Sequence, residues 1–568
     1  MKKIVSMLIA AAVVLGLGLS RARAAEPKPI AAVAVAGYND IIGNINYVGS
    51  LVNRPQLGAA ADGFVSLVTQ FKGLTGVDKT RPWGAIVQAG GEEDIVGYVC
   101  VPVTDFKAAL ELLELYNTVD AQGEIYKLTP KTGDKTTYVK KHGDWACFSD
   151  KAESLAHIAT DPLSALSNLE KNYIVAGKIF FRNVPESLHQ KAIEKFKEGF
   201  EREDADKKDD ESDAQFAQRK KFRDQFETYA VRVFGDLDEV SFGWALDRKA
   251  GNTYVDLNVT AKSGTTTAQE LALAAESKTN FAGFRLPDAM FTASIAGVIP
   301  PAKQEIALGF IGMVRGKVLG DIEKNTPENK REAVKSAAGD VLDLLTKIVK
   351  SGRVDAVVTN LISPKAATQL VAIYVADGQL FDKLLHAVVS AIEEDHPEVA
   401  QFIKLDAETV DGHQVHKISI PIPQEAENRD KLVQLIGEKL DIVIAVGKEN
   451  VYIADGRDAG AKLKKAVEAS SKAGAKPVTP VSASLDIKPI AGLVTVIGKP
   501  HEQKTAAMVE AELKKTAGKN HITFTVRPIS NGVQVRLEVE QGLVRLAGRL
   551  AAMKIEGKHL PGEEGDKE

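Results

Sequence analysis

The alternation of hydrophobic and polar residues predicts one local plan that recurs along the chain. In residues 83–115 a strand, a Gly-rich turn and a second strand lead into an amphipathic helix capped by Thr104 or Asp105. Apolar residues then recur at Phe106 and at the positions three, four and seven further on, which is the spacing of a helix with one core-facing side. The same order of hairpin and helix occurs in residues 240–275, 354–392 and 521–552.

The order of these units predicts two similar halves. Each half is expected to contain a strand–helix–hairpin–helix unit, a small multi-strand unit (124–158 and 403–467) and a second strand–helix–hairpin–helix unit. Proline closely follows three of the four leading strands, where it ends a strand and can open the next helix because it lacks a backbone N–H. These prolines are Pro185, Pro300 and Pro489.

The predicted fold class is therefore α+β, with antiparallel sheets backed by helices in two tandem similar halves. With 568 residues, the chain is long enough for more than one core. Residues 25–280 are expected to form the first half, including a charged helical insertion at 195–221. Residues 281–470 begin the second half, 481–553 close it, and 554–568 form a disordered tail.

The hairpin strands predict which sheet faces are buried. The strands at 95–101 and 370–376 are apolar on both faces, as in enclosed strands. The strands at 255–262 and 533–540 alternate instead. Their apolar residues are expected to point inward and their polar residues, such as Asp256 and Arg536, toward water. The inward set is Val255, Leu257 and Val259 in one strand and Val533, Val535, Leu537 and Val539 in the other.

The N-terminus predicts export. Lys2 and Lys3 precede an uncharged apolar run at 4–19, and the small-x-small pattern 22–24 follows it. The alternative is a membrane anchor, but the run is short for a span of ~20 residues. We interpret 1–24 as a signal peptide, which places the mature protein in the periplasm or at the cell surface.

Composition and charge narrow the function classes. The net charge is −4 from 72 basic and 76 acidic residues, and aromatic residues make up 6% of the chain. Neither a basic field nor a stacking platform for nucleic acid is therefore expected. Cys100 and Cys147 are the only cysteines. Two buried thiols are the favoured interpretation, while a disulfide stays open in an oxidising compartment.

Residues that could carry metal chemistry are few. A separation of three in a strand puts His413 and His416 on opposite faces, which excludes shared ligation. His386 and His396 are interpreted as lacking carboxylate companions at ligand spacing. The acidic stretch 201–213 has no Ca²⁺-loop spacing, so a solvated charged helix is expected.

Catalytic and aromatic candidates are equally sparse. No nucleophile elbow or phosphate loop is present, and a contact between Cys147 and His142 is less expected than a plain core cysteine. Three tryptophans are predicted to be packing anchors rather than a sugar-binding surface: Trp83, Trp145 and Trp244. Arg81 is a candidate for a cation–π contact with Trp83. No catalytic, cofactor-binding or metal residue is predicted, and no cofactor.

Three stretches carry a resemblance to a known group. They are residues 73–87, the strand start at 143–145 with Ser149 and Asp150, and the closing residues 532–546. Together they resemble a group of uncharacterised secreted proteins of planctomycete bacteria. The resemblance implies export from a Gram-negative-type cell and a duplicated architecture, and it assigns no site residues or activity.

The leading hypothesis is an exported, non-enzymatic binding or structural protein whose partner is an unknown protein or cell-envelope component. Its working surface is expected on the hairpins at 240–275 and 521–552. The alternative is a periplasmic ligand-binding protein with an apolar pocket between sheet and helices, lined by Tyr374, Phe381 and Leu384. The third hypothesis, a hydrolase with a dispersed site, has the least support.

Overall fold

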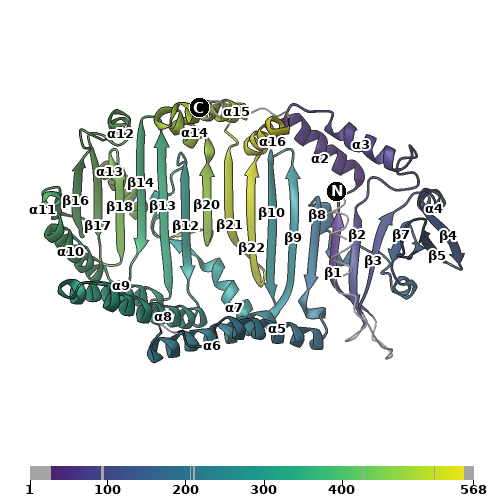
Figure 1. Ribbon diagram of the computed structural model, residues 1–568, viewed down its shortest axis with the longest axis horizontal. Helices are drawn as coiled ribbons and strands as arrows, with labels where there is room; N and C mark the ends of the chain where they lie inside the picture. Colours follow the sequence, from purple (N-terminus) through teal and green to yellow (C-terminus); the bar gives the residue numbers. More distant parts are fainter. Residues whose placement is uncertain are drawn as a thin grey trace. The chain divides into compact units, whose positions relative to one another are not determined.

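The computed structural model describes residues 27–90, 95–204, 206–208, 211–426, 428–516 and 518–555. The chain is a mixed α+β protein with antiparallel strands (Figure 1), as the sequence predicts at this level. It divides into two compact units. The first comprises residues up to 196, 237–262 and 536–552, and the second comprises 197–236, 263–535 and the residues from 553 on. The predicted signal peptide, 1–24, lies outside the described residues, as does most of the predicted tail.

The sheet of the first unit has β1 near its centre, where β1 pairs with β8 on one side and β2 on the other. The successive pairs give the order β10–β9–β8–β1–β2–β3–β7–β6–β5–β4. Residues 536–540, the second part of β22 (Gly532–Glu540), join this unit beside β10. The strands are β1 Lys28–Val35, β2 Trp83–Ala89, β3 Ile95–Pro102, β4 Asn117–Gln122, β5 Ile125–Pro130, β6 Thr137–His142, β7 Trp145–Ser149, β8 Val175–Phe180, β9 Leu237–Asp247 and β10 Asn252–Ala261.

The helices of the first unit begin where the sequence provides caps. Asp105 is the N-cap of α4, because its carboxylate accepts the backbone N–H groups of Lys107 and Ala108. Ala109 and Leu110 of α4 are buried against β5, β6 and β7. The elements are α2 Tyr38–Leu51, α3 Leu57–Val68, α4 Phe106–Leu113, α16 Gln541–Ile555 and the short 3₁₀ turns η1 Ala152–Ala156, η2 Ser164–Leu166 and η3 Leu169–Lys171.

The sheet of the second unit has the order β21–β20–β12–β13–β14–β18–β17–β16–β15. Its strands are β12 Phe291–Val298, β13 Arg353–Ser363, β14 Ala366–Tyr374, β15 Ile403–Val410, β16 His413–Pro421, β17 Lys439–Val446, β18 Asn450–Gly456, β20 Val481–Asp486 and β21 His521–Ile529. A separate short pair joins β11 Lys278–Thr279 to β19 Lys476–Pro477.

Helices cover both faces of this second sheet. On one face, α13 and the turn η6 Ala282–Phe284 enclose a cluster in which the Phe284 and Tyr452 rings stack 5.4 Å apart. On the other face, α9 and α10 bring Leu344 and Leu384 against β17 and β18. The helices are α6 Asp213–Asp236, α7 Thr266–Ala272, α8 Pro301–Asn325, α9 Glu328–Lys350, α10 Gly378–Asp395, α11 Pro397–Ala400, α12 Arg429–Ile436, α13 Ala459–Ala473, α14 Ile487–Ile497 and α15 Pro500–Lys514; α5 Glu186–Asp204 spans the boundary at 196.

The three prolines after leading strands stand at helix starts, as predicted. Pro185 immediately precedes α5, Pro300 is the N-cap residue of α8, and Pro489 lies in the first turn of α14. The fixed φ of proline suits the first turn, where its missing N–H has no helical partner to lose.

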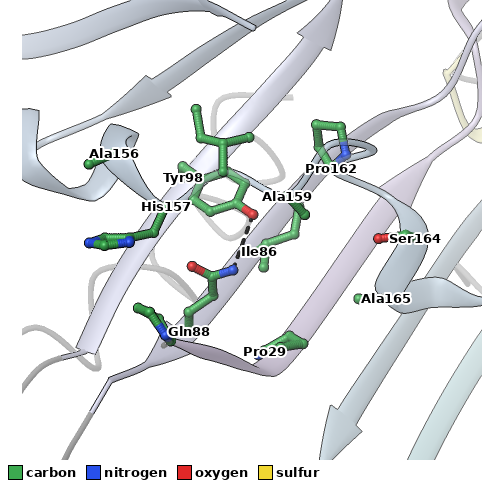
Figure 2. Close-up of a pocket in the computed structure, with 12 residues that line it drawn as sticks. Pro29, Ile86, Gln88, Tyr98, Ala156, His157, Ala159, Pro162, Ser164 and Ala165 are labelled. Atoms are coloured by element: carbon green, nitrogen blue, oxygen red, sulfur yellow. Dashed lines mark hydrogen bonds between the residues drawn. The ribbon is translucent and has the colours of Figure 1, made fainter. Parts of the chain in front are cut away.

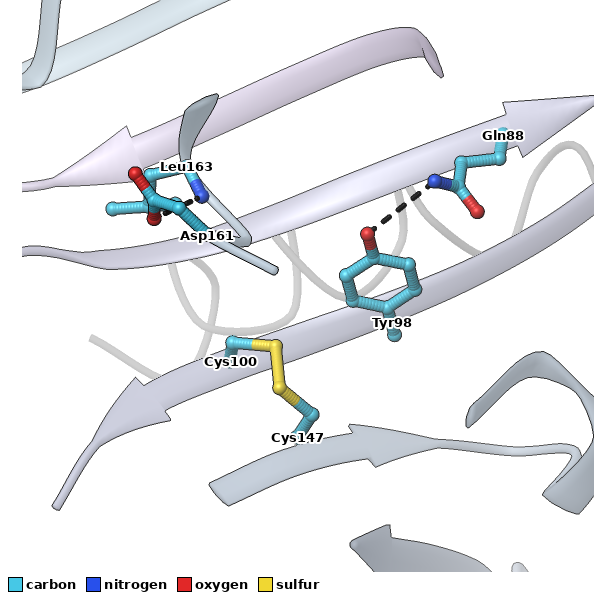
Figure 3. The surroundings of a disulfide bond; sticks show 6 residues. All are labelled: Gln88, Tyr98, Cys100, Cys147, Asp161 and Leu163. Carbon is cyan, nitrogen blue, oxygen red and sulfur yellow. Dashed lines mark hydrogen bonds between the residues drawn. A yellow bond between two sulfur atoms is a disulfide. The ribbon is translucent and has the colours of Figure 1, made fainter. Parts of the chain in front are cut away.

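A disulfide joins Cys100 of β3 to Cys147 of β7 (Figure 3), so the favoured interpretation of two thiols is wrong. The two cysteines lie directly opposite each other in the antiparallel β3–β7 pair, with Cα atoms 4.1 Å apart. Both are fully buried in the core cluster of the first unit. This cross-strand register could not be seen in the sequence, because β3 and β7 are not consecutive strands.

Candidate functional site

The strands β8, β9 and β10 of the first unit carry large apolar side chains on a solvent-exposed face. Phe242 lies between Gly177 and Leu257 in the sheet, and Trp244 lies opposite Val255. Leu537 of β22 shares this face, since its neighbour Arg536 points to the other. We call this set the apolar face. Its members, each between 41% and 47% exposed, are Ile179, Phe242, Trp244, Val255, Leu257 and Leu537.

The opposite face of the same strands buries charge. Asp256 is completely buried, and its two carboxylate oxygens accept hydrogen bonds from the Arg536 guanidinium, each 2.7 Å long. The Tyr173 hydroxyl donates a third bond of 2.7 Å to Asp256. The guanidinium also lies over the Tyr254 ring, 4.0 Å from its centroid. The bond to Asp256 raises the pKa of Arg536, and burial raises the pKa of Tyr173, so both stay protonated donors.

The predicted orientation of these strands is therefore wrong. The sequence predicts Val255 and Leu257 inside and Asp256 and Arg536 toward water. The structure shows the opposite orientation in β10 and in residues 536–540 of β22. Alternation fixes that residues two apart share a face; it does not fix which face is covered. Here the polar face is the covered one because Asp256, Arg536 and Tyr173 satisfy one another.

Two contacts hold the aromatic side chains of the apolar face in place. The Phe242 ring lies over Gly177, where a Cβ atom would be only 2.1 Å from the ring. The Trp244 indole N–H donates to Thr253 Oγ1 at 2.9 Å. The face is thus a formed surface with fixed rings.

A second feature of the first unit is a pocket of about 420 Å³ beside β2 and β3 (Figure 2). The Gln88 amide donates to the Tyr98 hydroxyl at 3.4 Å, while the Gln88 Oε1 atom is buried without a hydrogen-bond partner. Residues 156–165 form the opposite wall, and His157 and Ser164 lie on it. Burial raises the pKa of Tyr98, which keeps its hydroxyl protonated.

The histidines considered from sequence fall into two places. His413 and His416 do lie on opposite faces of β16, as predicted: His413 is beside Tyr452, and His416 faces α10. The interpretation that His386 and His396 lack carboxylate companions is wrong. Asp382 and Asp406 lie 3.9 and 3.3 Å from His386 Nε2, and Glu398 lies 3.4 Å from His396 Nδ1. The Asp382–His386 separation of four on a helix was the signal available in the sequence.

The tryptophan predictions are mixed. Trp145 is a core anchor, and Arg81 stacks on it at 4.3 Å, so the predicted contact of Arg81 with Trp83 is replaced by one with Trp145. Trp244 is part of the apolar face and anchors no core. The disulfide leaves Cys147 no thiol for a contact with His142.

The acidic stretch 201–213 is described in part, since residues 205, 209 and 210 lie outside the described ranges. Arg219 donates two hydrogen bonds to the Glu211 carboxylate, and Lys207 pairs with Asp213. The bonds from Arg219 lower the pKa of Glu211 to about 2. These carboxylates have basic partners, as expected of a charged helical segment.

The residues proposed to line an apolar pocket are core residues of the second unit. Tyr374 is buried in the cluster under α13, and Leu384 is buried in the cluster under α10, where Phe381 packs beside it. Their packing offers no support for the ligand-binding alternative at this location.

Comparisons with known proteins found no match: no family model, curated protein or solved structure is similar to this chain. Among the helices of the described residues, none has the length and hydropathy needed to cross a membrane.

Proposed function

We propose that this chain is an exported, non-enzymatic binding protein of the periplasm or cell surface, and that a protein partner docks on the apolar face. The observation that carries the proposal is the reversed sheet of the first unit, which buries Asp256 with Arg536 and leaves Phe242 and Trp244 half exposed. Single exposed apolar residues are ordinary, whereas a contiguous group of large ones indicates a contact surface.

The energetics favour coverage of this face. Complete burial of a large apolar side chain is worth roughly 1.5–3 kcal/mol. Covering six half-exposed side chains therefore supplies on the order of several kcal/mol toward association, before the cost of losing free motion. The fixed rings of Phe242 and Trp244 add little ordering cost.

The chemistry of the face favours a protein over a lipid or a nucleic acid. Its six side chains carry no charge, and neither a phosphate backbone nor an anionic headgroup would find a cation among them. An antiparallel sheet face packs well against a second sheet or an amphipathic helix. An apolar face on another envelope protein is the partner that this surface fits.

The proposal includes the duplicated architecture and the resemblance to secreted planctomycete proteins. Strand order supports the duplication: read from β9 to β4, the first sheet runs β9–β8–β1–β2–β3–β7–β6–β5–β4. The second runs β21–β20–β12–β13–β14–β18–β17–β16–β15, with corresponding hairpins at corresponding places. An experimental structure with a different order in either unit would contradict the duplication.

Site-specific photo-crosslinking in intact cells tests the binding proposal. A photoreactive phenylalanine analogue at position 244 should give one discrete protein adduct. The same analogue at Gln122, an exposed polar position on β4 of the same unit, is the control and should give none. Adducts to lipid alone, or equal adducts at both positions, would contradict a protein partner at this face. An adduct to a second copy would identify the chain itself as the partner.

Export is tested separately on the same cells. Mass spectrometry of the purified protein should find an N-terminus near Ala25 or Glu26, and fractionation should find the protein outside the cytoplasm. An intact N-terminus on a cytoplasmic protein would contradict export.

The pocket at Gln88 favours a second candidate function, the binding of a small polar ligand. Its volume of about 420 Å³ is in the range of ligand sites. The Gln88 Oε1 atom is a buried acceptor without a hydrogen-bond partner, so it could accept a hydrogen bond from a ligand. Native mass spectrometry should then find a small molecule on the wild-type protein and on Gln122→Leu, an exposed control, and lose it from Gln88→Leu. A protein that carries no small molecule from cells removes this candidate.

A further inference from the structure

Four ligand-type side chains of the second unit converge between α10 and the β15–β16 hairpin. Asp382 and His386 lie one turn apart on α10, Asp406 is on β15, and His416 is on β16. One nitrogen or oxygen atom from each of the four lies within 4.8 Å of the corresponding atom of every other. All four belong to the same compact unit.

The local structure explains why these residues meet. A spacing of four puts Asp382 and His386 on the same face of α10, and Leu384 packs the helix onto the sheet beside them. His416 lies opposite Ile444 in the β16–β17 pair, on the face that α10 covers. The register of β15 against β16 shifts between Lys404 and Glu408, and Asp406 sits in this irregularity with a φ of +49°. The shift directs Asp406 toward the two histidines.

His416 is the observation that points to a ligand. The residue is completely buried, and its Nε2 atom has no hydrogen-bond partner of acceptable geometry. Asp382 Oδ1 lies only 2.9 Å from this nitrogen, yet it too lacks a proper partner. The two atoms form a close pair with no further hydrogen-bond partner, which makes both available as ligands of one ion.

The distances suit a four-coordinate ion. Ligands with bonds of about 2.0–2.1 Å at tetrahedral angles are separated by roughly 3.3 Å. The separations include 2.9 Å between Asp382 and His416, 3.3 Å between His386 and Asp406, and 3.9 Å between His386 and Asp382.

We propose that these residues bind one first-row divalent metal ion of the zinc class. The four ligands are Asp382, His386, Asp406 and His416. Two imidazoles with two carboxylates select such an ion over Ca²⁺ or Mg²⁺, which prefer all-oxygen sites. The proposal is independent of the apolar face, since it concerns the other unit.

Ion binding requires one rearrangement. The backbone N–H of Asp406 now donates to His416 Nδ1 at 3.2 Å. With an ion on Nε2, the ring proton belongs on Nδ1, where the nearest carboxylate oxygen is Asp406 Oδ1 at 3.8 Å. The hydrogen bond from the Asp406 backbone N–H is therefore lost when the ion binds, while the Asp406 carboxylate serves as a ligand of the ion.

The test is calorimetric titration of Zn²⁺ into the full chain, purified without a histidine tag and treated with chelator. The wild-type protein should bind one equivalent with a micromolar or tighter dissociation constant. Asp382→Asn and His386→Gln should each weaken binding at least tenfold. Both side chains are partly exposed, so these variants remain folded more readily than a change at His416.

The matched control is His396→Gln. His396 also has a carboxylate neighbour, Glu398 at 3.4 Å, but it lies outside the cluster, so its loss should leave binding unchanged. Absence of saturable binding in the wild-type protein overturns the proposal. So does a loss of less than tenfold in both ligand variants, or an equal loss in the control. Substituted Co²⁺ gives a second readout, because its visible absorption bands should appear with wild-type protein and disappear with His386→Gln.

Discussion

Asp256 and Arg536 are joined by two hydrogen bonds of 2.7 Å, although 280 positions separate them in the chain. Asp256 is buried and Arg536 is partly buried on one face of a sheet whose other face exposes Phe242 and Trp244. A charge in this position is stable only while its partner is present, because water cannot replace the guanidinium.

We therefore predict that Arg536→Met lowers the free energy of unfolding by about 3–5 kcal/mol, since it leaves the buried Asp256 carboxylate with Tyr173 alone. Chemical denaturation of the first unit measures this. Adding Asp256→Asn should recover part of the loss by removing the unpaired charge. Arg182→Met is the control, because Arg182 pairs with Asp238 at a more exposed site and should cost less than about 1 kcal/mol. Equal losses at both arginines would contradict this assignment.

Reduction of the Cys100–Cys147 disulfide should destabilise the first unit by about 2–4 kcal/mol, because the bond closes a loop across a sequence separation of 47. Denaturation curves with and without reductant measure the shift. The Cys100→Ala/Cys147→Ala variant should unfold at the same denaturant concentration in both conditions. The disulfide would be contradicted if reductant left the unfolding midpoint of the wild-type protein unchanged and both cysteines could be alkylated in unreduced protein.

Asp377 is the N-cap of α10 in the second unit, and we expect its contribution to stability to depend on pH. Its carboxylate bonds Lys347 and accepts the backbone N–H of Leu380, and both contacts lower the pKa of Asp377. A lowered pKa in the folded state adds stability above the ordinary Asp value of about 3.9, and that stability is lost as the pH falls through the folded value. Asp377→Ala should cost about 1 kcal/mol at pH 7 and progressively less below pH 4.

Asp377→Asn separates the two contributions of this residue. Asparagine keeps the helix cap but cannot form the ion pair with Lys347. Most of the stability should therefore remain at pH 7, and its dependence on pH should disappear. Denaturation at several pH values measures both variants. A cost for Asp377→Ala that stays constant down to pH 2 would contradict the charged cap.

Gly177→Ala should destabilise the first unit by about 1–3 kcal/mol, because the new methyl group meets the Phe242 ring. The double variant with Phe242→Leu should lose less than the sum of the two single changes, since the smaller side chain makes room. Thermal unfolding of the four proteins gives this comparison. Additive losses would show that the ring does not lie on Gly177.

Much of the local structure could be predicted from periodicity. The helix from Phe106 to Leu113, its cap at Asp105, and the opposed faces of His413 and His416 follow from spacing within a few residues of chain. The helix starts near Pro185, Pro300 and Pro489 follow from the backbone chemistry of proline.

The remaining features depend on partners far away in the chain. Asp256 can be buried because Arg536 of β22 lies beside it, and Cys100 lies opposite Cys147 because β3 pairs with β7. The Asp382–His386 pair was readable as a helical spacing of four, but Asp406 joins it through a strand irregularity that no local pattern announces. The pairing of strands that are distant in the chain determines these sites. Local patterns in a single sequence do not show which distant strands pair.

The division of the chain also determines when each unit can fold. The first unit includes residues 536–552, which follow residues 263–535 of the second unit in the chain, so the strand partner of β10 is missing while that long segment is being synthesised. Asp256 is made before residues 263–535 of the second unit, and its partner Arg536 is made after them. Delivery of the chain from its N-terminus therefore cannot complete the first unit early, and folding is held back until the closing strand arrives.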